Sequence, residues 1–133
     1  MCPEIKKYEL LGSGILKRVV LTNFGAAIMS IEVQDRYGDI RDVALGFNKP
    51  EDYSNNPAFF GVVVGPIANR TKSAEFELNG TKYRMEVNEN SNNLHTDFDN
   101  GLHKRTFGET VDGEKIIFDI ELKDMEYGLP GNR

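Results

Sequence analysis

The chain has 133 residues, a formal net charge of −5 and an apolar fraction of 39%, values that suit one globular domain with a hydrophobic core. The charge is spread along the sequence, so no nucleic-acid partner is expected, because phosphate binding needs clustered Lys and Arg. Cys2 is the single cysteine, which excludes an intrachain disulfide and a cysteine-rich zinc site. With no apolar run near the roughly 18 residues of a membrane helix and no secretory leader, we expect a cytoplasmic protein without a membrane partner.

Most of the chain carries the alternating apolar pattern and β-branched composition of strands. In chain order, the pattern predicts strands over residues 5–10, 15–22, 27–33, 42–45, 59–64 and 116–122. Turn residues at 35–39 and 111–113 separate some of them. A single helical turn is expected over residues 49–53, with Pro50 near its start.

The clearest local pattern is a β-hairpin over residues 74–87. Apolar and polar residues alternate on both arms, and Asn79 and Gly80 between them tolerate the positive φ of a type I′ turn. No segment has the period of a long amphipathic helix, which disfavours a βαβ architecture. The sequence therefore predicts an all-β, antiparallel fold with long loops.

Two loops, residues 65–70 and 88–97, are dense in polar and turn-forming groups. The first ends at Arg70, whose planar guanidinium can donate paired hydrogen bonds to adjacent hydroxyls or to a carboxylate. The residue alone is more typical of a surface ion pair, for example with Glu75. Asn69 beside it is, by itself, an ordinary turn residue.

His95 lies in the second loop, where an imidazole could hydrogen-bond or protonate a sugar oxygen near neutral pH. Taken alone, His95 is more typical of an incidental loop or core histidine. The short basic run His103-Lys104-Arg105 is typical of a solvated turn. Neither histidine has a neighbouring cysteine or an HExxH-like spacing, so no metal site is predicted.

Several segments, in a fixed order, resemble the aldose 1-epimerase family. They are Asn23-Phe24-Gly25-Ala26, Leu45-Gly46-Phe47, Gly65-Pro66-Ile67-Ala68-Asn69-Arg70, Asn92-Asn93-Leu94-His95, Gly101-Leu102-His103-Lys104-Arg105 and Gly128-Leu129-Pro130-Gly131-Asn132. The third segment, followed by the hairpin, is the most specific match. The resemblance covers nearly the whole chain and the amino-terminal portion of the family.

The resemblance implies a galactose mutarotase-like antiparallel β-sandwich, with residues 1–133 as the amino-terminal part of a single domain that is incomplete at its C-terminal end. It implies an isomerase that interconverts the α and β anomers of free hexoses such as galactose or glucose, without a cofactor, by acid/base ring opening. Asn69, Arg70 and His95 are then expected to bind sugar, with His95 supporting the acid step. The principal acid and base are expected beyond residue 133, so the chain alone is expected to be inactive.

The chain departs from the family pattern at Ala74, Thr96, Asp97, Phe107 and Tyr127, which leaves the preferred sugar open. A hexose 6-phosphate mutarotase is an alternative that needs cationic contacts besides Arg70. A non-catalytic carbohydrate-binding domain or a purely structural β-module are alternatives from other classes. Unpaired strand edges would favour self-association.

Overall fold

Antiparallel strands make up most of the regular structure of the protein, which a computed structural model describes over residues 4–133. Residues 1–3, which include Cys2, lie outside the described part. The chain divides into two units. The first holds the chain up to Val63 and residues His103–Asp119; the second holds Val64–Leu102 and Ile120–Arg133.

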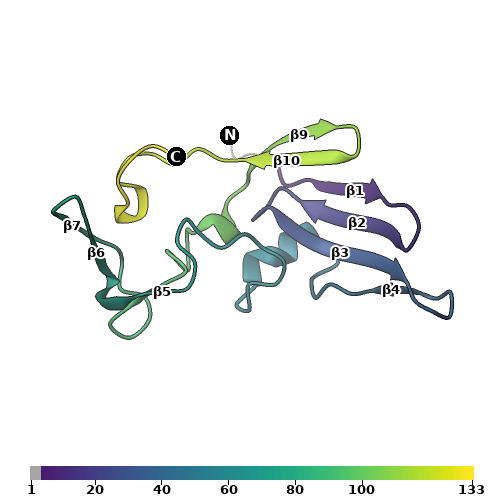
Figure 1. The fold of residues 1–133 in the computed structure, drawn as a ribbon, viewed down its shortest axis with the longest axis horizontal. Helices are drawn as coiled ribbons and strands as arrows, with labels where there is room; N and C mark the ends of the chain where they lie inside the picture. Colours follow the sequence, from purple (N-terminus) through teal and green to yellow (C-terminus); the bar gives the residue numbers. More distant parts are fainter. Residues whose placement is uncertain (1–3) are drawn as a thin grey trace. The chain divides into compact units, whose positions relative to one another are not determined.

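The first unit is built on a four-stranded antiparallel sheet (Figure 1). Its strands, in spatial order, are β1 (Lys7–Leu11), β2 (Leu16–Thr22), β3 (Ala27–Gln34) and β4 (Ile40–Asp42). The predicted strands at 5–10, 15–22 and 27–33 are confirmed with bounds shifted by one or two residues. A separate hairpin joins β9 (Gly108–Asp112) to β10 (Lys115–Asp119), so the reversal at 111–113 is confirmed, although β9 itself was not predicted.

The strand predicted over residues 42–45 is wrong beyond Asp42, where β4 ends. The Oδ1 atom of Asp42 accepts hydrogen bonds from the backbone N–H groups of Ile31 and Ala44, both at 3.0 Å. A side chain thus accepts from Ile31 N–H in place of a strand carbonyl, while Val43 N–H still donates to the Ile31 carbonyl at 2.9 Å.

The strand predicted over residues 59–64 is also wrong, because Phe59 and Gly61 have φ values of 57° and 66°. These left-handed conformations interrupt an extended backbone. The segment still lies beside the start of β3, since Ile28 N–H donates to the Gly61 carbonyl and Val63 N–H donates to the Gly25 carbonyl, each at 2.9 Å.

The core of the first unit gathers around Tyr53, which is fully buried. Tyr53 lies on the 3₁₀ turn η1 (Pro50–Asn55), which confirms the predicted helical turn. Its hydroxyl accepts a 3.2 Å hydrogen bond from Phe47 N–H, and the Phe47 ring packs edge-on against it with centroids 5.1 Å apart. Val20, Ala27 and Met29 complete the buried cluster.

The basic run His103-Lys104-Arg105 is not the solvated turn that the sequence predicted. His103 is only 3% exposed, lies on η3 (Leu102–Lys104) and packs against the Phe59 ring, with centroids 4.7 Å apart. The Arg105 carbonyl accepts a 2.7 Å hydrogen bond from Gly25 N–H. Backbone pairing and an aromatic contact therefore draw this segment into the unit despite its charge.

The second unit contains two short strand pairs. One joins β6 (Glu75–Leu78) to β7 (Thr81–Arg84), and positive φ at both Asn79 (52°) and Gly80 (78°) confirms the predicted hairpin turn. The other joins β5 (Arg70–Thr71) to β8 (Asn93–Leu94). The buried apolar cluster of this unit consists of Ala74, Met85 and Leu129. The C-terminal segment, with η4 (Glu126–Gly128), thus packs on the hairpin.

None of the helices formed by residues 4–133 has the length and apolar character that a membrane span requires.

Substituting Gly14 and Gly61 of the first unit distinguishes the cost of a strained backbone from the cost of a steric clash. Gly14 and Gly61 have similar φ values, 63° and 66°. A Cβ atom on Gly14 would meet nothing within 4 Å, whereas one on Gly61 would lie 2.1 Å from the Ile28 carbonyl oxygen. We expect Gly14→Ala to lower the free energy of unfolding by about 1 kcal/mol and Gly61→Ala by about 3 kcal/mol. Urea unfolding followed by circular dichroism measures the stability of both variants. Equal losses would contradict the close approach of Gly61 to the Ile28 carbonyl.

Candidate functional site

The two polar loops that the sequence singled out meet at the β5–β8 pair of the second unit. Arg70 lies opposite Leu94, and Thr71 lies opposite Asn93. The two loops therefore run together at the point where residues 69 and 95 leave the strands. This brings all three sequence-predicted site residues, Asn69, Arg70 and His95, into one region.

Asn69 and His95 are joined by two hydrogen bonds. The backbone N–H of His95 donates to the Asn69 carbonyl at 3.1 Å, and the backbone N–H of Asn69 donates to the imidazole Nδ1 of His95 at 2.9 Å. Both residues have positive φ, 65° and 58°, so neither continues its strand. An imidazole that accepts at Nδ1 carries its proton on Nε2. The pairing thus assigns His95 the tautomer that can donate a hydrogen bond from Nε2.

The loop that carries His95 is held by two buried polar side chains, Asn93 and Thr96, which are 0% and 1% exposed. The Thr96 hydroxyl accepts from Ile67 N–H and donates to the Ile67 carbonyl, both at 2.9 Å. The Asn93 amide donates to the carbonyls of Glu86 and Thr96, each at 2.7 Å. Thr96 therefore ties the His95 loop to the loop of residues 65–70, and every one of these buried groups is satisfied.

Arg70 forms an ion pair, but its partner is Glu89 and not Glu75. Its Nε lies 3.2 Å from both carboxylate oxygens of Glu89, and its Nη2 lies 2.8 Å from Oε1. Glu75 instead faces Lys82 and Arg84, at 4.0 and 3.7 Å, because the hairpin register places it opposite Arg84.

The Arg70–Glu89 pair is charged and accessible to solvent. The hydrogen bond from Arg70, with its positive charge, holds the pKa of the Glu89 carboxyl below its usual range, and Glu89 raises the pKa of Arg70 in the same way. The side chains are 55% and 25% exposed. A polar ligand could therefore reach both groups without first breaking a buried pair.

The residues that sequence reasoning missed are Glu89, Asn93 and Thr96. All three lie in the polar loop of residues 88–97, so sequence analysis located the loop but not the roles of these residues. The pairing of Glu89 with Arg70 and of Thr96 with Ile67 depends on strand register, which a polar loop does not encode.

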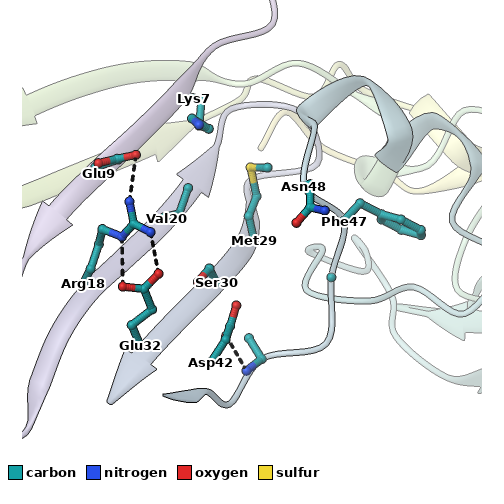
Figure 2. A pocket seen from close by; sticks show the side chains of 12 residues that line it. Lys7, Glu9, Arg18, Val20, Met29, Ser30, Glu32, Asp42, Phe47 and Asn48 are labelled. Atoms are coloured by element: carbon teal, nitrogen blue, oxygen red, sulfur yellow. Dashed lines mark hydrogen bonds and ion pairs between the residues drawn. The ribbon is translucent and has the colours of Figure 1, made fainter. Parts of the chain in front are cut away.

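A separate polar pocket of about 270 Å³ lies on one face of the sheet in the first unit (Figure 2). Arg18 crosses it, bound to Glu32 through Nε and Nη2 and to Glu9 through Nη1 at 3.4 Å. Asp42 at its edge holds backbone N–H groups. These charges satisfy one another, which is typical of a solvated sheet face. Within residues 4–133, no group of three or more His, Cys, Asp or Glu side chains could hold a metal ion.

Comparison with known proteins gives one consistent family. The family model described as aldose 1-epimerase matches residues 10–132. Galactose mutarotase of Bos taurus is 34% identical over 127 residues, which are 96% of this chain and 36% of that protein. Aldose 1-epimerase of Escherichia coli (strain K12) is 27% identical over an alignment of 137 positions, which covers 99% of this chain and 39% of that protein. The chain thus spans little more than a third of the length of these relatives.

Solved structures support the same fold. A GalM/aldose epimerase homologue from C. elegans superposes with a TM-score of 0.87 and 27% identity, covering 97% of this chain and 39% of that chain. Galactose 1-epimerase from Lactobacillus acidophilus NCFM gives a TM-score of 0.72 at 21% identity, which is a likeness of fold alone. The protein is all-β with antiparallel sheets of the galactose mutarotase-like type, as the sequence predicted.

Replacing the Thr96 hydroxyl with a methyl group tests the link between the two loops. Thr96→Val keeps the shape but leaves the N–H and C=O of Ile67 without this partner, so we expect a loss of about 1–3 kcal/mol in the free energy of unfolding. We also expect faster hydrogen exchange at the Asn69 and His95 amides. Thr81→Val, at an exposed strand end, is the control and should cost less than about 0.5 kcal/mol. Equal effects of the two substitutions would show that Thr96 does not join the loops.

Proposed function

The chain belongs to the aldose 1-epimerase family, and from this premise we propose that it supplies sugar-binding residues of an enzyme that interconverts the α and β anomers of free hexoses such as galactose or glucose. The observation that carries the proposal is the 2.9 Å hydrogen bond from Asn69 N–H to His95 Nδ1. It fixes an imidazole with its remaining proton on Nε2, the form needed to donate to a sugar oxygen.

The reaction needs proton transfers at two ends of one hemiacetal. A base removes the proton of the anomeric hydroxyl while an acid protonates the ring oxygen, so that the bond from the ring oxygen to the anomeric carbon breaks and an open-chain aldehyde forms. Rotation about the adjacent carbon–carbon bond and reclosure give the other anomer. Each catalytic group must lie within hydrogen-bond reach of its oxygen. In this proposal His95 binds on the ring-oxygen side and supports the acid step.

Arg70 is proposed to bind sugar hydroxyls, with Asn69 lining the same site. A guanidinium donates through fixed, planar N–H groups, which suits a pair of neighbouring hydroxyl oxygens. Its charge is already matched by Glu89. This arrangement favours a neutral sugar over a hexose 6-phosphate, because a phosphate would need cationic groups that are not neutralised.

Of the three residues proposed here to bind sugar, His95 alone can exchange a proton near neutral pH, because Asn69 is an amide and the guanidinium of Arg70 stays protonated. We therefore propose that the chain binds sugar weakly and does not accelerate mutarotation alone, and that residues 1–133 form the amino-terminal part of a single β-sandwich domain whose principal acid and base lie elsewhere in it. No cofactor enters the proposed reaction, and we propose a cytoplasmic location.

The test combines NMR spectroscopy with polarimetry. Titrating the ¹⁵N-labelled chain with D-galactose should shift the signals of Asn69, Arg70 and His95, while fresh α-D-galactose should mutarotate at the spontaneous rate in its presence. His95→Asn keeps a residue that tolerates positive φ but removes the imidazole, and we expect at least about tenfold weaker binding, the loss expected for one good hydrogen bond. Ser91→Ala in the same loop is the control and should bind as the unchanged chain does.

Absence of any sugar-dependent shift at these three residues would contradict the binding role. Mutarotation above the spontaneous rate would contradict the proposal that the chain is inactive alone. Saturable binding without catalysis, even in a protein that also carries the proposed acid and base, would instead favour a non-catalytic carbohydrate-binding domain.

A further inference from the structure

We propose that Glu89 is a second sugar-binding residue, and that Glu89 and Arg70 together recognise a pair of neighbouring hydroxyl groups. This inference rests on the proposed function, because it assigns a ligand to the same site. It concerns a carboxylate that the sequence did not single out, and it predicts which feature of the sugar the site reads.

The geometry of the ion pair leaves part of the guanidinium directed away from Glu89. The carboxylate engages Nε and Nη2 of Arg70, that is, one edge of the planar group. A guanidinium has five N–H donors, and this contact uses the Nε–H and one of the Nη2 hydrogens. The two N–H groups of Nη1 and the second of Nη2 point to other directions, on a side chain that is 55% exposed.

Arg18 in the first unit provides an internal comparison. Glu32 holds its Nε and Nη2 in the same way, but Glu9 also lies 3.4 Å from its Nη1. Two carboxylates thus surround that guanidinium and engage all three of its nitrogen atoms. Arg70 faces one carboxylate on one edge only. Glu89 therefore orients the guanidinium while its Nη1 is left to donate hydrogen bonds to a ligand.

Glu89 is held firmly enough to orient its partner. Its backbone N–H donates to the Asn92 carbonyl at 3.1 Å, and its carbonyl accepts from Asn92 N–H at 2.8 Å. Asn90, at the tip of this tight turn, has a φ of 53°, a conformation that Asn tolerates. The side chain of Asn92 also accepts from Ser73 N–H at 3.1 Å, which ties the turn to the segment that follows β5.

The chemistry of the pair matches that of a diol. An ionised carboxylate has about four lone-pair sites, so Glu89 can accept a hydrogen bond from a hydroxyl while it still holds Arg70. The outward N–H groups of Arg70 can donate to the oxygen of the neighbouring hydroxyl. One hydroxyl thus donates and the next accepts, as two adjacent hydroxyls of an aldose can do together. Each contact involves a charged partner, which makes it stronger than a neutral hydrogen bond.

The experiment measures galactose and its four monodeoxy analogues (2-, 3-, 4- and 6-deoxy) binding to the ¹⁵N-labelled chain and to its Glu89→Gln variant. In the unchanged chain, galactose should shift the Arg70 Nε–H signal, and at least one deoxy sugar should bind about tenfold more weakly. In Glu89→Gln, galactose should bind about tenfold more weakly, and the preference over that deoxy sugar should fall to about twofold or less. Glu86→Gln, an exposed glutamate three residues earlier, makes the same charge change and should alter neither value.

The selectivity ratio separates recognition from a structural role. If Glu89→Gln weakens all five sugars equally, or leaves them unchanged, the inference is wrong while the sugar site stands. If galactose shifts the His95 and Asn69 signals but not Arg70 Nε–H, the inference fails in the same way. If galactose shifts none of these signals, the proposed function itself fails. Should Glu89→Gln not fold, the Arg70 Nε–H response of the unchanged chain to galactose and to its deoxy analogues decides the question.

Discussion

The pairing of Asn69 with His95 is the interaction on which the functional interpretation depends. One backbone N–H, aimed at Nδ1 from 2.9 Å, decides which nitrogen of the imidazole carries the proton and thereby whether the ring can donate or accept at its other end. Because the donor is a backbone N–H, every residue type except proline carries it at position 69. The contact requires both residues to adopt positive φ, a strained conformation that surrounding contacts must hold.

The rest of the second unit provides those contacts. Thr96 bonds both polar groups of the Ile67 backbone, and Asn93 fills the turn beneath His95. The hairpin β6–β7 and the C-terminal segment pack together around Ala74, Met85 and Leu129. Short strands of two residues hold little by themselves. In this unit, buried and fully hydrogen-bonded polar groups therefore contribute stability that strand pairing and a larger apolar core provide in the first unit.

Sequence reasoning succeeded where the information is local. Asn79-Gly80 specifies its turn, and the alternation in residues 27–33 specifies a strand, because both follow from neighbouring residues. It failed where distant contacts decide. Residues 59–64 have the apolar composition of a strand, but the positive φ of Phe59 and Gly61 interrupts it. His103 is buried against the Phe59 ring, a contact that the local sequence pattern does not predict. In the site, the positions of Asn69, Arg70 and His95 were predicted through family resemblance, but the partner of Arg70 was not, since Glu89 reaches it only through the β5–β8 register.

The most direct test of this account is a long-range ¹H–¹⁵N NMR spectrum of the His95 imidazole at neutral pH, recorded without and with D-galactose. The account predicts an unprotonated Nδ1 and a protonated Nε2 in the chain alone, with the Nε2 signal shifting as galactose binds. A proton on Nδ1, or an Nε2 signal indifferent to saturating galactose, would contradict it.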